Sequence, residues 1–239
     1  MISSLLSGGF TQQDLMVLLV RLFIMLMILP LHECAHGWVA YKLGDDTAMY
    51  QGRLTLNPIA HLDPVGSLLL LLTGYGWAKP VPVNPNRFNR KHSLRFGMAL
   101  TAAAGPASNL LAGFVGMILL RFYMISDYYT SYYNDLIAGE SANSAPELIY
   151  TLLSAFVSIN IGLAIFNLVP VPPLDGSKIV AYFTGDKIER WITRNYQVIR
   201  IVFFVIVVSG ILSVPLGFID GLVFDLYVFL TNWIPKLFG

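Results

Sequence analysis

Charged residues and cysteine are both scarce in this chain of 239 residues. Asp, Glu, Lys and Arg make up 12% of it, against 56% hydrophobic residues, and Cys34 is the single cysteine. A soluble domain of this size could not bury so much apolar surface. One cysteine excludes an internal disulfide framework, and a formal net charge of +1 leaves no basic surface for nucleic acid. The composition therefore indicates a protein that is largely solvated by membrane lipid.

Four long apolar runs predict helices that cross a membrane, because a crossing takes about 20 residues of helix. The runs cover residues 15–31 (continuing to Tyr41), 98–120, 148–174 and 201–219. Residues 64–78 are shorter and predict a re-entrant or interfacial segment, whereas the sequence leaves open whether 226–235 crosses. Extended stretches at 47–56 and 79–83 predict a short β-hairpin. The expected fold is an all-α polytopic membrane protein with about four to five transmembrane helices plus this membrane-associated β-hairpin or re-entrant segment.

The basic residues are distributed unevenly between the loops. Seven lie within residues 42–95 and five within 178–200, whereas 126–147 hold four acidic residues and no basic one. Cytoplasmic loops of membrane proteins carry the excess of Lys and Arg. We therefore expect a multi-pass protein of the cytoplasmic membrane, with the two basic segments inside and the acidic loop and the amino terminus outside.

The first apolar run contains the pattern His-Glu-x-x-His at residues 32–36. Ionisable residues inside an apolar helix are costly and therefore indicate function. On a helix, His32 and His36 share one face, and Glu33 lies beside them. This spacing offers two imidazole ligands to Zn²⁺ and a carboxylate that can act as general base. The structural alternative is a pair of histidines at the membrane interface, with Glu33 paired to Lys42.

A zinc hydrolase needs a third protein ligand and an open fourth position. Asp175 ends the third apolar run, and the charge distribution places it on the same side of the membrane as His32 and His36. The sequence therefore predicts one Zn²⁺ per chain, held near the cytoplasmic face. The alternative for Asp175 is a helix cap or a turn residue before Gly176.

Two further motifs follow the His-Glu-x-x-His pattern along the chain. They are Gly-Pro-x-x-Asn at 105–109 and Asn-x-x-Pro-x-Pro-x-x-Asp-Gly at 167–176. In this order, the three motifs resemble those of the site-2 protease family of intramembrane zinc metalloproteases. Residues 52–85 look like the short prokaryotic branch, which lacks a PDZ or CBS domain. The likeness implies a single membrane-embedded protease domain over 1–239, with its catalytic core at 15–190 and a C-terminal helical segment at 198–236.

The resemblance implies an intramembrane zinc endopeptidase that cuts peptide bonds within or beside transmembrane segments of membrane-protein substrates. In that reading His32, His36 and Asp175 bind the zinc, and Glu33 activates the attacking water. Two polar side chains could steady the substrate or the oxyanion. They are Asn167, carried over from the family motif, and Asn109, a polar residue in the uncharged second apolar run. Their alternative role is hydrogen bonding between helices.

A divalent-metal transporter that uses the same His and Asp ligands stays open as a different class of function. Transport paths place ligands at successive depths of the membrane, whereas these candidates gather at one level. A binder of membrane helices without activity is a second alternative, although it would have no need of Glu33. An edge strand at 47–56 could also pair with an extended substrate. The sequence leaves the substrate's identity, the need for an earlier cleavage and the oligomeric state open.

Overall fold

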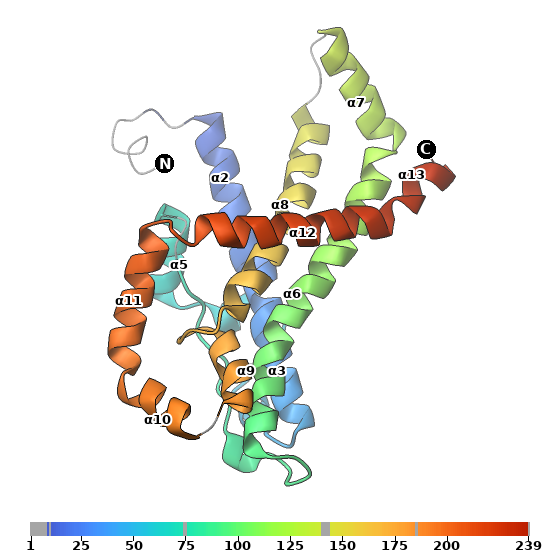
Figure 1. The fold of residues 1–239 in the computed structure, drawn as a ribbon. Helices are drawn as coiled ribbons and strands as arrows, with labels where there is room; N and C mark the ends of the chain where they lie inside the picture. Colours follow the sequence, from blue (N-terminus) through green and yellow to red (C-terminus); the bar gives the residue numbers. More distant parts are fainter. Residues whose placement is uncertain (1–8, 10, 74–75, 140–143, 185, 239) are drawn as a thin grey trace.

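The structure is a computed structural model that describes residues 9, 11–73, 76–139, 144–184 and 186–238 (Figure 1). Every regular element in these ranges is a helix, and none of their residues lies in a strand. Four helices are long and apolar enough to cross a membrane, namely Asp14–Lys42, Leu94–Met124, Ala145–Leu168 and Ser213–Phe238. The predicted all-helical membrane architecture is therefore confirmed.

The first membrane-length helix is built from three consecutive pieces: α2 (Gln12–Phe23), the π-helical turn η1 (Ile24–Ile28) and α3 (Leu29–Lys42). Thr11 caps its start, since the Thr11 side chain accepts from the Asp14 amide and the Asp14 carboxylate accepts from the Thr11 amide. The π-helical turn precedes Pro30, which lacks an N–H and crowds the preceding turn. Arg21 donates to the Leu71 carbonyl at 2.6 Å and so ties this helix to α5.

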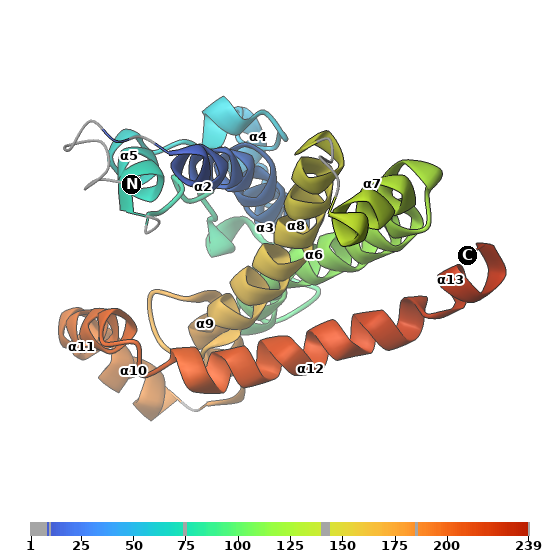
Figure 2. The same ribbon diagram turned by 90° about the horizontal axis from the view of Figure 1, so that it is seen from above.

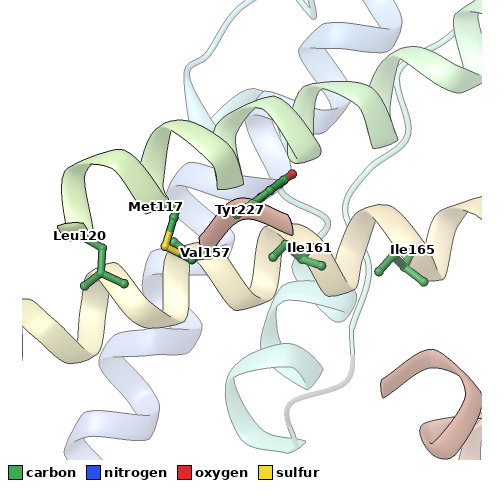
Figure 3. Close-up of a cluster of buried hydrophobic side chains, with 6 residues drawn as sticks. All are labelled: Met117, Leu120, Val157, Ile161, Ile165 and Tyr227. Atoms are coloured by element: carbon green, nitrogen blue, oxygen red, sulfur yellow. The ribbon is translucent and has the colours of Figure 1, made fainter. Parts of the chain in front are cut away.

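The centre of the bundle lies between α6 (Leu94–Met124) and α8 (Ser144–Leu168). Figure 3 shows the buried apolar cluster that joins them to α12 (Ser213–Thr231), formed by Met117, Leu120, Val157, Ile161, Ile165 and Tyr227. Glycine lets the two helices approach closely, because a Cβ on Gly116 would lie 2.7 Å from a ring carbon of Phe156. Further along this pair, α6 packs against α3 and α9 (Asp175–Phe183), the helices that carry His32, His36 and Asp175.

The connection between α3 and α6 holds four short helices: α4 (Thr47–Tyr50), η2 (Pro58–His61), α5 (Pro64–Thr73) and η3 (Pro85–Arg87). The β-hairpin predicted there is wrong. Residues 47–50 form a helical turn because the Asp45 carboxylate accepts from the Thr47 amide at 3.0 Å. Residues 79–83 are extended, but their amides bond elsewhere, Lys79 to the His61 carbonyl and Val81 to Glu33. At ten residues, α5 is too short to cross a membrane, as predicted.

Most of the described residues from 127 onward also lie in helices. The elements are α7 (Asp127–Ala138), α9 (Asp175–Phe183), α10 (Asp186–Arg194), α11 (Tyr196–Val208), α12 (Ser213–Thr231) and α13 (Trp233–Phe238). The predicted crossing at 201–219 is wrong, because the chain turns at Gly210, whose φ is +75°. Pro215 falls in the first turn of α12, where no amide donor is required. Residues 226–235 belong to α12 and α13, and α12 crosses α6 and α8 instead of running alongside them (Figures 1 and 2).

Candidate metal centre

The helix α3 presents His32 and His36 on one face, one turn apart, as its period requires. Both side chains are buried, and their Nε2 atoms lie 3.1 Å apart. The two rings meet edge to face, with centroids 4.7 Å apart. Two ring nitrogens from one helix therefore point at the same small volume.

Asp175 enters this volume from the first residue of α9. Its Oδ2 atom lies 3.3 Å from His32 Nε2 and 3.1 Å from His36 Nε2. Gly176 makes this position possible, because a Cβ there would lie 2.2 Å from the Leu168 carbonyl oxygen. Within the described ranges, these three residues are the one group of three or more His, Cys, Asp or Glu side chains that could hold a metal ion, with ligand atoms all within 4.8 Å of one another.

The far side of each ring shows which nitrogen carries the proton. His36 Nδ1 lies 2.7 Å from the Thr101 carbonyl oxygen, which can only accept a hydrogen bond. His32 Nδ1 lies 2.5 Å from Asn109 Oδ1, also an acceptor. In neutral rings both protons therefore reside on Nδ1, and both Nε2 lone pairs face the Asp175 carboxylate. Three hydrogen-bond acceptors that converge with no hydrogen between them form a suitable site for a cation. Two imidazoles and one carboxylate are a set of ligands that Zn²⁺ binds.

The helix α6 closes the site on its remaining side. A Cβ on Gly105 would lie 2.4 Å from His36 Nε2 and 2.6 Å from His32 Cε1, so only glycine leaves room for both rings. Asn109, one turn further on, contacts His32. The Gly-Pro-x-x-Asn motif thus combines a residue that makes space for the histidines with one that bonds to them.

Glu33 lies beside the two histidines, half-buried, at the edge of a cavity of about 340 Å³. The Val81 amide donates to Glu33 Oε2 at 2.9 Å and fixes the direction of the carboxylate. Most of residues 76–83, a segment without regular secondary structure, line the cavity together with the apolar Leu163 and Phe166 of α8. The cavity therefore joins a polar, metal-binding end to an apolar lining.

Asn167 also lines this cavity, and its amide donates to the Leu163 carbonyl at 2.9 Å, one turn back along α8. Asn109 lies deeper and is fully buried, with its oxygen directed to His32 and its nitrogen to Asn160. Asn160 was not among the residues predicted from the sequence. The signal was present, since Asn160 is a polar side chain inside a membrane-length apolar run, the same reason for which Asn109 was singled out.

Opposing effects act on the Asp175 carboxyl. Burial raises its pKa, whereas hydrogen bonds that the His32 and His36 rings donate when they carry a proton on Nε2, together with the positive charge of Lys178, lower it; the lowering prevails, so that the pKa lies well below its ordinary value. Lys178, one turn further along α9, has its Nζ atom 3.7 Å from Asp175 Oδ1. Asp175 is consequently a carboxylate at neutral pH, which is the form that binds a metal.

A buried His/His/Asp group with a glutamate one residue away is suited to hydrolysis assisted by zinc, and the described chain has four helices long and apolar enough to cross a membrane. These features define a multi-pass membrane metalloprotease of the His-Glu-x-x-His type. The sequence matches Peptidase family M50 over residues 20–211. The chain belongs to this family, the site-2 proteases, as the motifs predicted.

Two curated relatives carry the same description. The chain is 41% identical over 187 residues to the "Putative zinc metalloprotease YwhC" of Bacillus subtilis (strain 168), covering 78% of this chain and 77% of that protein. It is 25% identical over 156 residues to the "Putative zinc metalloprotease Rip2" of Mycolicibacterium smegmatis (strain ATCC 700084 / mc(2)155), covering 63% of this chain and 52% of that protein. The second match thus spans about half of the relative's length. No solved structure matches the chain significantly.

Proposed function

We propose that this metalloprotease hydrolyses peptide bonds within or beside transmembrane segments of membrane-protein substrates. The observation that carries the proposal is the convergence of three acceptor atoms next to Glu33, at one end of a cavity lined largely by apolar side chains. A substrate taken from the membrane needs such a lining for its own apolar side chains.

In this proposal His32, His36 and Asp175 hold one Zn²⁺ per chain. When bound, the zinc supplies an acidified water and polarises the scissile carbonyl. Glu33 takes the proton from the attacking water and later delivers it to the leaving amine. The hydrogen bond from the Val81 amide supports this role, because it holds the Glu33 carboxylate in one orientation beside the metal ligands.

Asn167 is the candidate that contacts the substrate. Its side chain lines the cavity, and one of its two amide hydrogens is used by the Leu163 carbonyl. The second hydrogen is available to the substrate carbonyl, where negative charge develops during the reaction. Asn109 is less suited to this role, since its oxygen faces His32 and its nitrogen donates to Asn160.

We further propose that the site lies near the cytoplasmic face of the cytoplasmic membrane, with the amino terminus outside. The charge distribution supports this orientation. Residues 42–95 follow the end of α3 that carries His32 and His36, and they include seven basic residues. Residues 178–200 follow Asp175 and include five. Such an excess marks cytoplasmic segments. A cysteine-accessibility scan with impermeant reagents on intact cells, using single cysteines at residues 130 and 90, tests this orientation.

The function is tested by measuring zinc content and cleavage of single-span membrane peptides in detergent. We expect wild type to hold about one zinc and to cut, Glu33→Gln to keep zinc but not cut, and Asp175→Ala to lose most of its zinc. Proteoliposomes loaded with a metal-sensitive dye separate the other class of function. Uptake of metal ions without any peptide cleavage would make the chain a transporter and would contradict the proposal.

A further inference from the structure

A chain of buried amides connects α8 to the metal site. The Asn160 Nδ2 atom donates to the Phe156 carbonyl at 2.8 Å, and Asn109 Nδ2 donates to Asn160 Oδ1 at 2.8 Å. Asn109 Oδ1 then lies 2.5 Å from His32 Nδ1. Both asparagine side chains are 0% exposed. The three bonds therefore form an uninterrupted path from a backbone carbonyl to a predicted zinc ligand.

The direction of every bond in this path follows from its first member. The Phe156 carbonyl can only accept, so Asn160 must turn its NH₂ group toward it and its oxygen toward Asn109. Asn109 must then present its NH₂ group to Asn160 and its oxygen to His32. An oxygen that can only accept requires the proton of His32 on Nδ1. The Nε2 lone pair is consequently free on the side where Asp175 lies.

From this path we infer that Asn160 is a positioning residue of the metal centre, which orients the Asn109 amide so that His32 offers Nε2 to zinc. The inference rests on the proposed zinc site and adds to it a residue that does not touch the metal. Without Asn160, the Asn109 amide can turn over and present its NH₂ group to His32. The ring then accepts through Nδ1, and its proton moves to Nε2, where it competes with the metal.

An ordinary structural role would be to join α6 to α8 by the Asn109–Asn160 bond alone. Two features favour the positioning role. A hydrogen bond that served only to join α6 to α8 would need no third side chain. The Asn109 oxygen nevertheless lies 2.5 Å from His32 Nδ1, on α3. The neighbours of Asn160 on α8 are also apolar and fully buried, Val157 at 0% and Ile161 at 1% exposure, so α8 already packs through them. In that dry setting an amide keeps the partners that satisfy it.

The test compares zinc affinity in two backgrounds, by competition with a chromophoric chelator in detergent. Loss of a partner that orients a metal ligand weakens metal binding by about 10- to 100-fold, and we expect that loss for Asn160→Leu. Asn109→Asp supplies a second background in which a carboxylate accepts from His32 in either orientation, and the zinc affinity of that variant is the reference there. In the Asn109→Asp background, Asn160→Leu should then have no further effect.

An equal loss in both backgrounds would show that Asn160 acts through packing and would overturn the inference. The same holds if Asn160→Leu binds zinc like wild type. Thr231→Val is the matched control, since Thr231 is fully buried on another helix and bonds to its own Tyr227 carbonyl one turn back at 2.7 Å. It should leave zinc affinity unchanged. Should Asn160→Leu fail to fold, Asn160→Ala removes the amide without adding bulk.

The outcomes also separate this inference from the proposed function. Wild type that binds no zinc would overturn both. Wild type that binds zinc and cleaves, together with an Asn160→Leu variant of equal zinc affinity, would overturn the inference alone.

Discussion

Gly105→Ala should remove zinc from the protein without unfolding it. The added Cβ would lie 2.4 Å from His36 Nε2, whereas ordinary contacts begin at 3.4 Å, so the ring must retreat by about 1 Å. Metal–ligand distances tolerate changes of only about 0.2 Å. The same Cβ would lie 2.6 Å from His32 Cε1, so both helical ligands are displaced together. We expect zinc affinity to fall by at least about 100-fold, or about 2.7 kcal/mol.

The fold should survive this change, because alanine is favoured over glycine inside a helix by about 1 kcal/mol. Zinc affinity by chelator competition and helical content by circular dichroism are measured on the same preparations. Gly113→Ala, in the same helix, is the control, since its Cβ would lie 3.4 Å from its nearest neighbours. That variant should bind zinc like wild type. A Gly105→Ala protein that also binds zinc like wild type would refute the geometry of the site.

Three further predictions concern Glu33, Val81 and Asp175. Glu33→Gln should keep its zinc and lose about 10²- to 10⁴-fold in cleavage rate, the usual contribution of a general base; loss of zinc in this variant would contradict the assigned role. Val81→Pro removes the amide that donates to Glu33 and should slow cleavage by about 10-fold or more, since a hydrogen bond to a charged group contributes about 1.5–3 kcal/mol. Val81→Ala keeps that amide and should cleave like wild type. The pKa of Asp175 is lowered in the folded protein, so its contribution to stability is complete above the ordinary value of 3.8 and is lost as the pH falls through the folded value. Thermal unfolding of the metal-free protein should accordingly lose stability on acidification below about pH 4, and Asp175→Asn should flatten this dependence; an equally steep dependence in the variant would assign it to other carboxyls.

The helix period and the charge distribution together were enough to predict that His32, His36 and Asp175 come together. The four-residue spacing places His32 and His36 on one face whatever their surroundings, and the loop charges placed Asp175 at the same end of the bundle. The β-hairpin could not be judged from alternation alone, because the Asp45 carboxylate starts a helical turn at Thr47 that alternation does not detect.

Two other features lay beyond the reach of the sequence. The apolar run at 201–219 continues through the turn, and the break depends on the left-handed conformation at Gly210, which composition does not reveal. Asn160 stands among apolar residues without a motif around it, and its importance becomes visible only when α6 is packed against α8 and Asn109 is seen between it and His32. Local periodicity therefore predicts ligands, whereas their supporting hydrogen bonds depend on tertiary packing.

The metal centre draws on four helices, and this has a consequence for how the protein holds together. The three candidate ligands come from α3 and α9, while α6 and α8 supply the bonds that direct the histidine rings. Three acceptor atoms about 3.1–3.3 Å apart repel one another until a cation lies between them. Under the proposed zinc site, an ion bound to the folded chain would stabilise it by mass action, and it would join α3 to α9 where both line the cavity. The same ion that would supply the chemistry thus also fixes the arrangement of the helices that direct it.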